Sequence, residues 1–132
     1  MVFDTDLVIA HIRRDELLPS RAILPLFLVG ELKAFAIKNQ WQRRRMAMLA
    51  HLLKAHPIPD IAPELPDLYA RVDAYSQGQL PGQPLPNGLS ARNMSKNDPW
   101  ITATALYLDL PLHTTDRDFE HLPPLGLRLV LE

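Results

Sequence analysis

Short apolar runs alternate with longer stretches of helical periodicity along this chain, and this alternation constrains its fold more than any other feature. Strands are expected at residues 2–4, 22–28, 111–115 and 127–131, and helices at 5–13, 29–39, 42–55, 64–77 and 99–109. Alternation of this kind is typical of an α/β fold. We therefore predict a three-layer α/β architecture, with a mostly parallel central sheet flanked by helices.

Two segments need separate comment. The run 22–28 is continuously apolar, as expected for a strand buried on both faces, but it contains Pro25, which cannot donate to a strand ladder. The segment 78–97 is rich in Gly and Pro and is expected to be a loop. A loop of about 20 residues inside a compact domain is often functional. This one leads to Asp98.

Length and composition favour one domain over residues 1–132. The sequence has no Cys, which excludes disulfides and thiolate metal sites and favours a reducing compartment. There is no apolar run of about 18 residues to span a membrane, and Asp4 and Asp6 at the start do not suit a signal peptide. We expect a cytoplasmic protein that does not contact membranes.

Acidic residues stand where predicted strands end or predicted helices begin. Asp4 closes the first strand, Glu31 opens the helix 29–39, Asp98 precedes another helix, and Asp116 follows the strand 111–115. In an open parallel sheet, the carboxyl ends of the strands form the functional crevice. Four carboxylates converging there would repel one another unless a hard divalent cation neutralised them. The pattern predicts a Mg²⁺-dependent reaction on phosphate, with Mn²⁺ as a substitute for Mg²⁺.

Each of these acids also has an ordinary structural explanation. Asp98 suits a helix N-cap, worth about 1 kcal/mol, and Glu31 in a first turn would answer the helix dipole, worth about 0.3–1 kcal/mol. Asp4 and Asp116 suit turns. Four such coincidences at one sheet edge are harder to accept than one. The pairs Asp4–Asp6 and Asp116–Asp118 would offer one carboxylate to the metal and a second to its water shell.

The net charge of −1 conceals an asymmetry. Without Asp4, Asp6, Glu31, Asp98, Asp116 and Asp118, the chain holds 14 basic and 9 acidic residues, a net charge of +5. A metal-filled acidic site within a basic surface suits a polyanionic substrate.

Four motifs resemble those of PIN-domain ribonucleases, especially the VapC-type toxins of type II toxin–antitoxin systems. They are Phe3-Asp4-Thr5-Asp6, Val29-Gly30-Glu31-Leu32, Asn97-Asp98-Pro99-Trp100 and Thr114-Thr115-Asp116-Arg117-Asp118. The resemblance covers nearly the whole chain. It implies a PIN-like fold, hydrolysis of RNA phosphodiester bonds with Mg²⁺, a cognate antitoxin as partner and a homodimer, for which the helices 29–39 and 42–55 offer apolar faces.

The resemblance also implies roles for individual residues. Asp4 and Asp98 would be the main metal ligands, and Asp116 would hold the metal directly or through water. Glu31 would orient or deprotonate the attacking water, or help to bind a second ion. Supporting roles are expected for Asp6, Asn97, Thr114 and Asp118, although strand-end and cap positions explain Asn97 and Thr114 equally well.

Basic and aromatic residues are the candidates for RNA contact. They are Lys33 and Lys38 on one predicted helix, Arg43, Arg44 and Arg45 on the next, and Trp41 and Trp100 for base stacking. Charge on the outer face of a helix is more often only solvated, and either Trp is at least as suited to the core.

Two other functions fit part of the pattern. A haloacid-dehalogenase-like phosphatase also begins with a strand followed by Asp-x-Asp, with Asp4 as nucleophile, but Leu7 stands where a glycine usually follows. A non-catalytic PIN module would bind RNA or a protein partner without cleavage. Loss of acids would mark such a module, and none is lost here.

Overall fold

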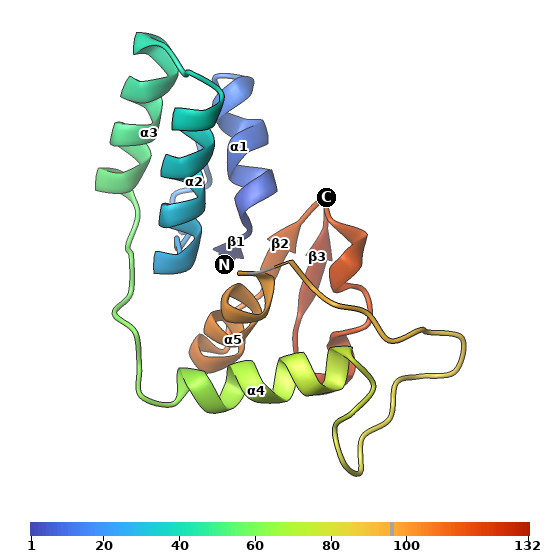
Figure 1. Ribbon diagram of the computed structural model, residues 1–132. Helices are drawn as coiled ribbons and strands as arrows, with labels where there is room; N and C mark the ends of the chain where they lie inside the picture. Colours follow the sequence, from blue (N-terminus) through green and yellow to red (C-terminus); the bar gives the residue numbers. More distant parts are fainter. Residues whose placement is uncertain (96) are drawn as a thin grey trace.

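The computed structural model describes residues 1–95 and 97–132, and contains a parallel sheet with helices around it (Figure 1). The strands are β1 (Val2–Phe3), β2 (Leu112–Thr114) and β3 (Leu129–Leu131), in the spatial order β1-β2-β3. The helices are α1 (Thr5–Arg13), α2 (Leu26–Lys38), α3 (Arg43–Ala55), α4 (Leu65–Ser76) and α5 (Asp98–Leu108). The predicted open α/β fold is confirmed. Position 96, in the predicted loop 78–97, lies outside the described residues.

The sheet is small, and its strands run in one direction. Val2 pairs with Leu112, and Leu112 pairs in turn with Leu129, so that β2 occupies the centre. Val2, Phe3 and Leu112 are almost completely buried, as expected for parallel strands covered on both faces. Because all three strands end at the same edge, the residues that follow β1 and β2 are brought together there.

The predicted strand 22–28 is wrong. Only Ile23 makes a bridge to Val2, and α2 begins at Leu26 instead of at residue 29. Pro25 is the cause, because it ends the extended segment and its carbonyl then accepts from the N–H of Leu28 (3.0 Å) and of Val29 (3.3 Å). Proline suits the start of a helix, since its missing N–H would be unpaired there in any case. The apolar run 26–29 is therefore the first turn of a helix, in which Leu28 and Val29 are buried while Leu26 is 46 % exposed.

The other helices agree with the predictions within one or two residues. α4 packs along α5, and α1 packs against α2 and α3 (Figure 1). In α3, however, the predicted apolar face is only partly covered, because Leu49 is buried while Met46 is 43 % exposed. This face forms one wall of an apolar groove that it shares with Lys33 and Ile37 of α2. Within the described ranges, no helix has the length and apolar character needed to cross a membrane.

Candidate active site at the carboxyl edge of the sheet

Asp4 lies directly after β1 and is the most rigidly held of the candidate residues. It is 3 % exposed and is the N-cap of α1. Its Oδ1 accepts from the backbone N–H of Leu7 (3.0 Å), and its Oδ2 accepts from the Thr114 hydroxyl (2.5 Å). Burial raises the pKa of Asp4 from 3.8 to about 6, against the opposing effect of these two hydrogen bonds.

Thr114 links the ends of β1 and β2. Its hydroxyl oxygen donates to Asp4 and accepts from the backbone N–H of Asp116 (2.9 Å). Asp116, which is half-buried, accepts through Oδ1 from the N–H of Asp118 (2.8 Å) and so caps the short 3₁₀ turn Arg117–Phe119. The fully buried Thr114 thus fixes the orientation of two acidic residues at once.

Asp98 is the first residue of α5 and is half-buried. The N-cap position belongs to Asn97, so the interpretation of Asp98 as the helix cap is wrong. Burial is the main cause that raises the pKa of Asp98 from 3.8 to about 7, and the charges of Glu31, Asp4, Asp116 and Asp6 follow in that order. These four acids therefore crowd Asp98 from elements that are distant in the sequence.

Glu31 is the sixth residue of α2, not a residue of its first turn as predicted. The helix-dipole explanation for this acid therefore fails, because that effect fades beyond the first turn. Burial raises the pKa of Glu31, the nearby side chains of Asn97 and Thr5 oppose this shift, and the charge of Asp6 adds to it. Its Oε1 is buried and has no hydrogen-bond partner among the described residues.

The remaining predicted acids lie farther out. Asp6 is exposed, yet its charge acts on Asp4, Glu31 and Asp98, which places it at the rim of the cluster. Asp118 is 69 % exposed, and its Oδ1 lies 3.8 Å from Nη1 of Arg92. Asp118 therefore contributes to the site through its backbone N–H, while its side chain points to another partner.

The cluster combines crowded carboxylates with restricted geometry. In the described part of the chain, no three acidic or histidine side chains are near enough together to hold a metal ion jointly. Mg²⁺ commonly takes only one or two carboxylates directly and keeps several waters. The oxygen-only donor set and the unpaired Oε1 of Glu31 fit such a cation in its chemistry.

One polar group near the cluster was missed as a site residue. Thr102 is fully buried in α5, and its hydroxyl has no hydrogen-bond partner within the described ranges. The spacing of four residues from Asp98 places both on one face of α5, and this spacing was visible in the sequence.

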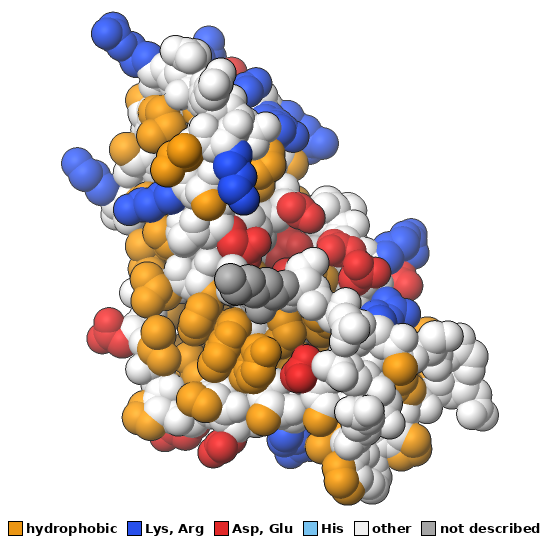
Figure 2. All heavy atoms as spheres, viewed as in Figure 1, with side chains coloured by type: hydrophobic (Ala, Val, Ile, Leu, Met, Phe, Trp, Pro, Cys, Tyr) orange, Lys and Arg blue, Asp and Glu red, His pale blue; other side chains and the backbone are white. Residues whose placement is uncertain are grey.

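The predicted RNA-contacting residues occupy three different places. Lys38 lies beside Asp6 and Glu31 in a groove between α1 and α2, whereas Lys33 lies in the apolar groove between α2 and α3. Arg44 pairs with Asp15 (Nε to Oδ1, 3.0 Å), and Arg43 is exposed at the start of α3. Figure 2 shows acidic side chains near the middle of one face, with Lys and Arg above them over α1–α3.

The two tryptophans are packed against other aromatic rings. Trp100 stacks on Phe27 and Tyr69, with ring centroids 5.0 and 4.2 Å away, and Trp41 is 8 % exposed and meets Phe35 edge-on. These contacts indicate that both tryptophans pack within the protein, which is the alternative to stacking on RNA bases.

Comparison with known proteins places this fold among toxin–antitoxin structures. No protein-family model and no curated protein matches the chain. It is similar to a chain of VapBC-1 from nontypeable Haemophilus influenzae, with a TM-score of 0.70, 19% identity and coverage of 99% of this chain and 98% of that one.

A chain of VapBC2 from Rickettsia felis, bound to a DNA fragment from their promoter, gives a TM-score of 0.72, 16% identity and coverage of 100% and 99%. A toxin–antitoxin complex from Klebsiella pneumoniae gives 0.64, 19% identity and coverage of 98% and 94%. At these identities the likeness establishes the fold, and this fold agrees with the resemblance carried by the four motifs.

Proposed function

We propose that this chain, which shares the fold of the VapBC toxin–antitoxin structures, is a Mg²⁺-dependent endoribonuclease and the toxin of a toxin–antitoxin pair. One observation carries the proposal. Asp4, Glu31, Asp98 and Asp116 come from four separate segments, and their charges meet at the carboxyl edge of the sheet. A protein gains nothing in stability from such crowding, so a cation and a phosphate substrate are its simplest explanation.

The cation, when bound, would cancel charge on the phosphate and lower the pKa of a bound water. Asp4 and Asp98 would hold it, with Asp116 contributing directly or through water. Mn²⁺ would be accepted in its place, since both ions prefer oxygen ligands. Thr114 and the N–H of Leu7 keep the Asp4 carboxylate in one orientation, so that this ligand needs no rearrangement on binding.

Glu31 is proposed to orient the attacking water and to accept its proton. Burial raises the pKa of Glu31, and this shift together with its unpaired Oε1 suits a group that takes up a proton. Asp6, Asn97 and Asp118 would support the site from its rim, Asp118 through the backbone contact to Asp116.

The phosphatase alternative makes a different prediction for Asp4. It requires a phospho-aspartate at Asp4, whereas the proposed hydrolysis leaves this residue unmodified, so trapping of that intermediate would favour the phosphatase. The non-catalytic PIN module does not explain why five mutually repelling acids would be kept together.

The partners follow from the structural neighbours and are proposals for this chain. The neighbours are toxin–antitoxin structures, so a cognate antitoxin protein is the expected partner, alongside the RNA substrate. A homodimer and a cytoplasmic location belong to the same proposal.

Cleavage of RNA by the purified protein tests the function. The wild type should cleave single-stranded RNA in Mg²⁺ and lose activity in EDTA. Asp98→Asn and Asp4→Asn should abolish cleavage, while the exposed Asp60→Asn is the matched control and should keep it. Undiminished cleavage by well-purified Asp98→Asn would remove this residue from the mechanism and the carboxylate cluster with it.

A further inference from the structure

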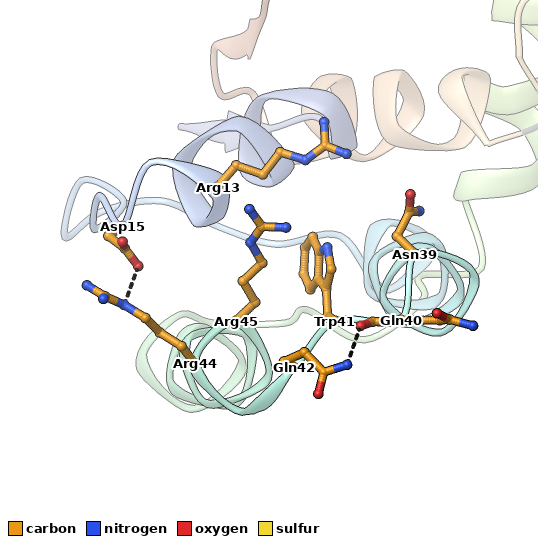
Figure 3. Close-up of a pocket in the computed structure, with 8 residues that line it drawn as sticks. All are labelled: Arg13, Asp15, Asn39, Gln40, Trp41, Gln42, Arg44 and Arg45. Atoms are coloured by element: carbon orange, nitrogen blue, oxygen red, sulfur yellow. Dashed lines mark hydrogen bonds and ion pairs between the residues drawn. The ribbon is translucent and has the colours of Figure 1, made fainter.

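A second polar cavity lies at the opposite end of the helices from the acids. It has a volume of about 310 Å³ and collects residues from the end of α1, the end of α2 and the start of α3 (Figure 3). We name it the arginine pocket, after Arg13, Arg44 and Arg45, which line it together with Asn39, Trp41 and Gln42. None of the roles assigned to the acidic cluster uses Arg13 or Arg45.

The arginine pocket carries uncompensated positive charge. Asp15 also lines it and pairs with Arg44, but Arg13 and Arg45 have no ion-pair partner in the described part of the chain. Arg13 instead lies over the ring of Phe35, with its guanidinium carbon 5.0 Å from the ring centroid. Three arginines against one aspartate leave a local charge of about +2, which favours an anionic ligand.

The start of α3 adds to this field. Its first three residues are all arginine, its first turn has no acid, and the side chain of Gln42 makes no capping hydrogen bond. Cations at the positive end of a helix dipole are unfavourable by roughly 0.3–1 kcal/mol each. A phosphate would reverse this penalty by meeting the free N–H groups and the guanidinium groups together.

Trp41 supplies an independent observation that points to a ligand with an acceptor oxygen. The residue is 8 % exposed, and its indole N–H has no hydrogen-bond partner among residues 1–95 and 97–132. In Figure 3 the indole nitrogen faces the space between Arg13 and Asn39. An unpaired buried donor costs about 1–3 kcal/mol, which an acceptor oxygen from a ligand would recover.

A groove between α1 and α2 borders the acidic cluster and ends at Phe35, whose ring lies under the Arg13 guanidinium of the arginine pocket. Asp6 and Glu31 line its acidic end, while Phe35 and Lys38 line the end toward Arg13. Seven residues separate Asp6 from Arg13 on α1, and seven separate Glu31 from Lys38 on α2. At 1.5 Å per residue the path along the two helices is about 10 Å long.

We propose that the arginine pocket binds the phosphate backbone of single-stranded RNA about 10 Å from the scissile bond, with the intervening strand in the α1–α2 groove. This inference rests on the proposed ribonuclease function and names the determinant that positions its substrate. Arg13 and Arg45 are then positioning residues, since they contact the RNA away from the reacting phosphate. The continuity of the groove with the acids favours RNA over an acidic protein as the occupant.

Binding measured without cleavage tests this proposal. A fluorescent ten-nucleotide RNA is titrated with protein in EDTA at several salt concentrations. The pocket variant carries Arg13→Gln, Arg44→Gln and Arg45→Gln. The control variant loses the same charge through Arg21→Gln, Lys54→Gln and Arg71→Gln, which are exposed and lie outside the arginine pocket.

The pocket variant should bind at least tenfold more weakly at 0.1 M salt, and its slope of log affinity against log salt should fall by about 2, since each lost phosphate contact removes about 0.7. The control variant should stay within twofold of wild type. If the pocket variant does not fold by circular dichroism, Arg45→Gln and Lys54→Gln form the single-site comparison, with an expected slope change of about 0.7.

Three results would overturn the proposal. In the first, wild type and pocket variant bind RNA equally well, or neither binds it. In the second, the pocket variant and the control variant lose RNA affinity to the same extent. In the third, the pocket variant keeps its RNA affinity but no longer binds a glutamate oligomer that the wild type binds. Failure of the nuclease proposal looks different. In that case the wild type leaves RNA intact in Mg²⁺, while the pocket variant still loses RNA binding.

Discussion

Replacing Asp98 by Asn should stabilise the metal-free protein at pH 8 while abolishing its activity. Burial destabilises the charged form of Asp98 and raises its pKa to about 7, and the negative charges of nearby acids add to this shift. These acids are Glu31, Asp4, Asp116 and Asp6. Asn has nearly the same shape and no charge, so the substitution removes this repulsion without opening a cavity. Most substitutions destabilise, which makes the expected sign informative.

The magnitude follows from linkage between protonation and folding. A shift from 3.8 to about 7 is about 3 pH units, and at 1.36 kcal/mol per unit this sets a ceiling of about 4 kcal/mol. Because the folded-state pKa is raised, the stability that the protonated group contributes is complete below pH 3.8 and is lost as the pH rises through about 7. The Asp98→Asn variant has no carboxyl group to ionise at this position, so it keeps that stability over the whole range.

Partial exposure of Asp98 and movement of neighbouring side chains make the effect smaller than this ceiling. We therefore expect the free energy of unfolding of Asp98→Asn to exceed that of the wild type by about 1–3 kcal/mol at pH 8. At pH 5 the gain should be smaller by about 1–2 kcal/mol, because Asp98 is then mostly protonated in the folded protein.

Urea denaturation in EDTA at pH 5, 6, 7 and 8 measures this difference. Asp60→Asn, an exposed loop substitution, is the control for removal of a carboxylate outside the cluster. In Mg²⁺ the wild type should become more stable than Asp98→Asn, since the cation stabilises only the wild type. A variant less stable than wild type at pH 8, or a difference that does not change with pH, would refute the electrostatic reasoning.

Three further predictions concern residues around the cluster. Thr114→Val should destabilise the protein by about 1–3 kcal/mol in thermal melts. It should also move the acid limb of the pH–activity profile to higher pH, because Asp4 loses a hydrogen bond that lowers its pKa. The exposed Thr115→Val is the control and should change neither the stability nor the pH profile. Glu31→Gln should lower the single-turnover cleavage rate by about 10²–10⁴ and leave the melting temperature within a few degrees, whereas a loss below tenfold would deny it the role of base. Asp118→Asn should change the rate less than about threefold, since its backbone N–H makes the contact, and a loss as large as that of Glu31→Gln would contradict this assignment.

The sequence predicted the fold well where one signal dominated. Strict helical periodicity identified α1, α3, α4 and α5, and Asp4 and Asp116 follow β1 and β2 as predicted. The segment around Pro25 failed because an apolar run of this length suits a buried strand and a buried helix equally, and only the tertiary context decides. The same error displaced the start of α2 and put Glu31 in the first turn of a helix.

Other parts of the site depend on contacts that are distant in the sequence. The Thr114 hydroxyl donates to Asp4, which lies 110 positions away in the sequence, and no local sequence pattern predicts this contact. The crowding of Asp98 likewise arises from three other segments. The arginine pocket needs the ends of α1 and α2 to meet the start of α3, so Arg13 and Arg45 could not be joined to one site beforehand.

The chemistry of the cleaved RNA ends tests the central claim most directly. The wild type is incubated with RNA and Mg²⁺ in water enriched in oxygen-18, and the new ends are analysed by mass spectrometry. The carboxylate cluster as a site of metal-assisted hydrolysis predicts a linear terminal phosphate that contains one solvent oxygen, and no product in EDTA. Ends carrying 2′,3′-cyclic phosphate, or equal cleavage in EDTA, would contradict it.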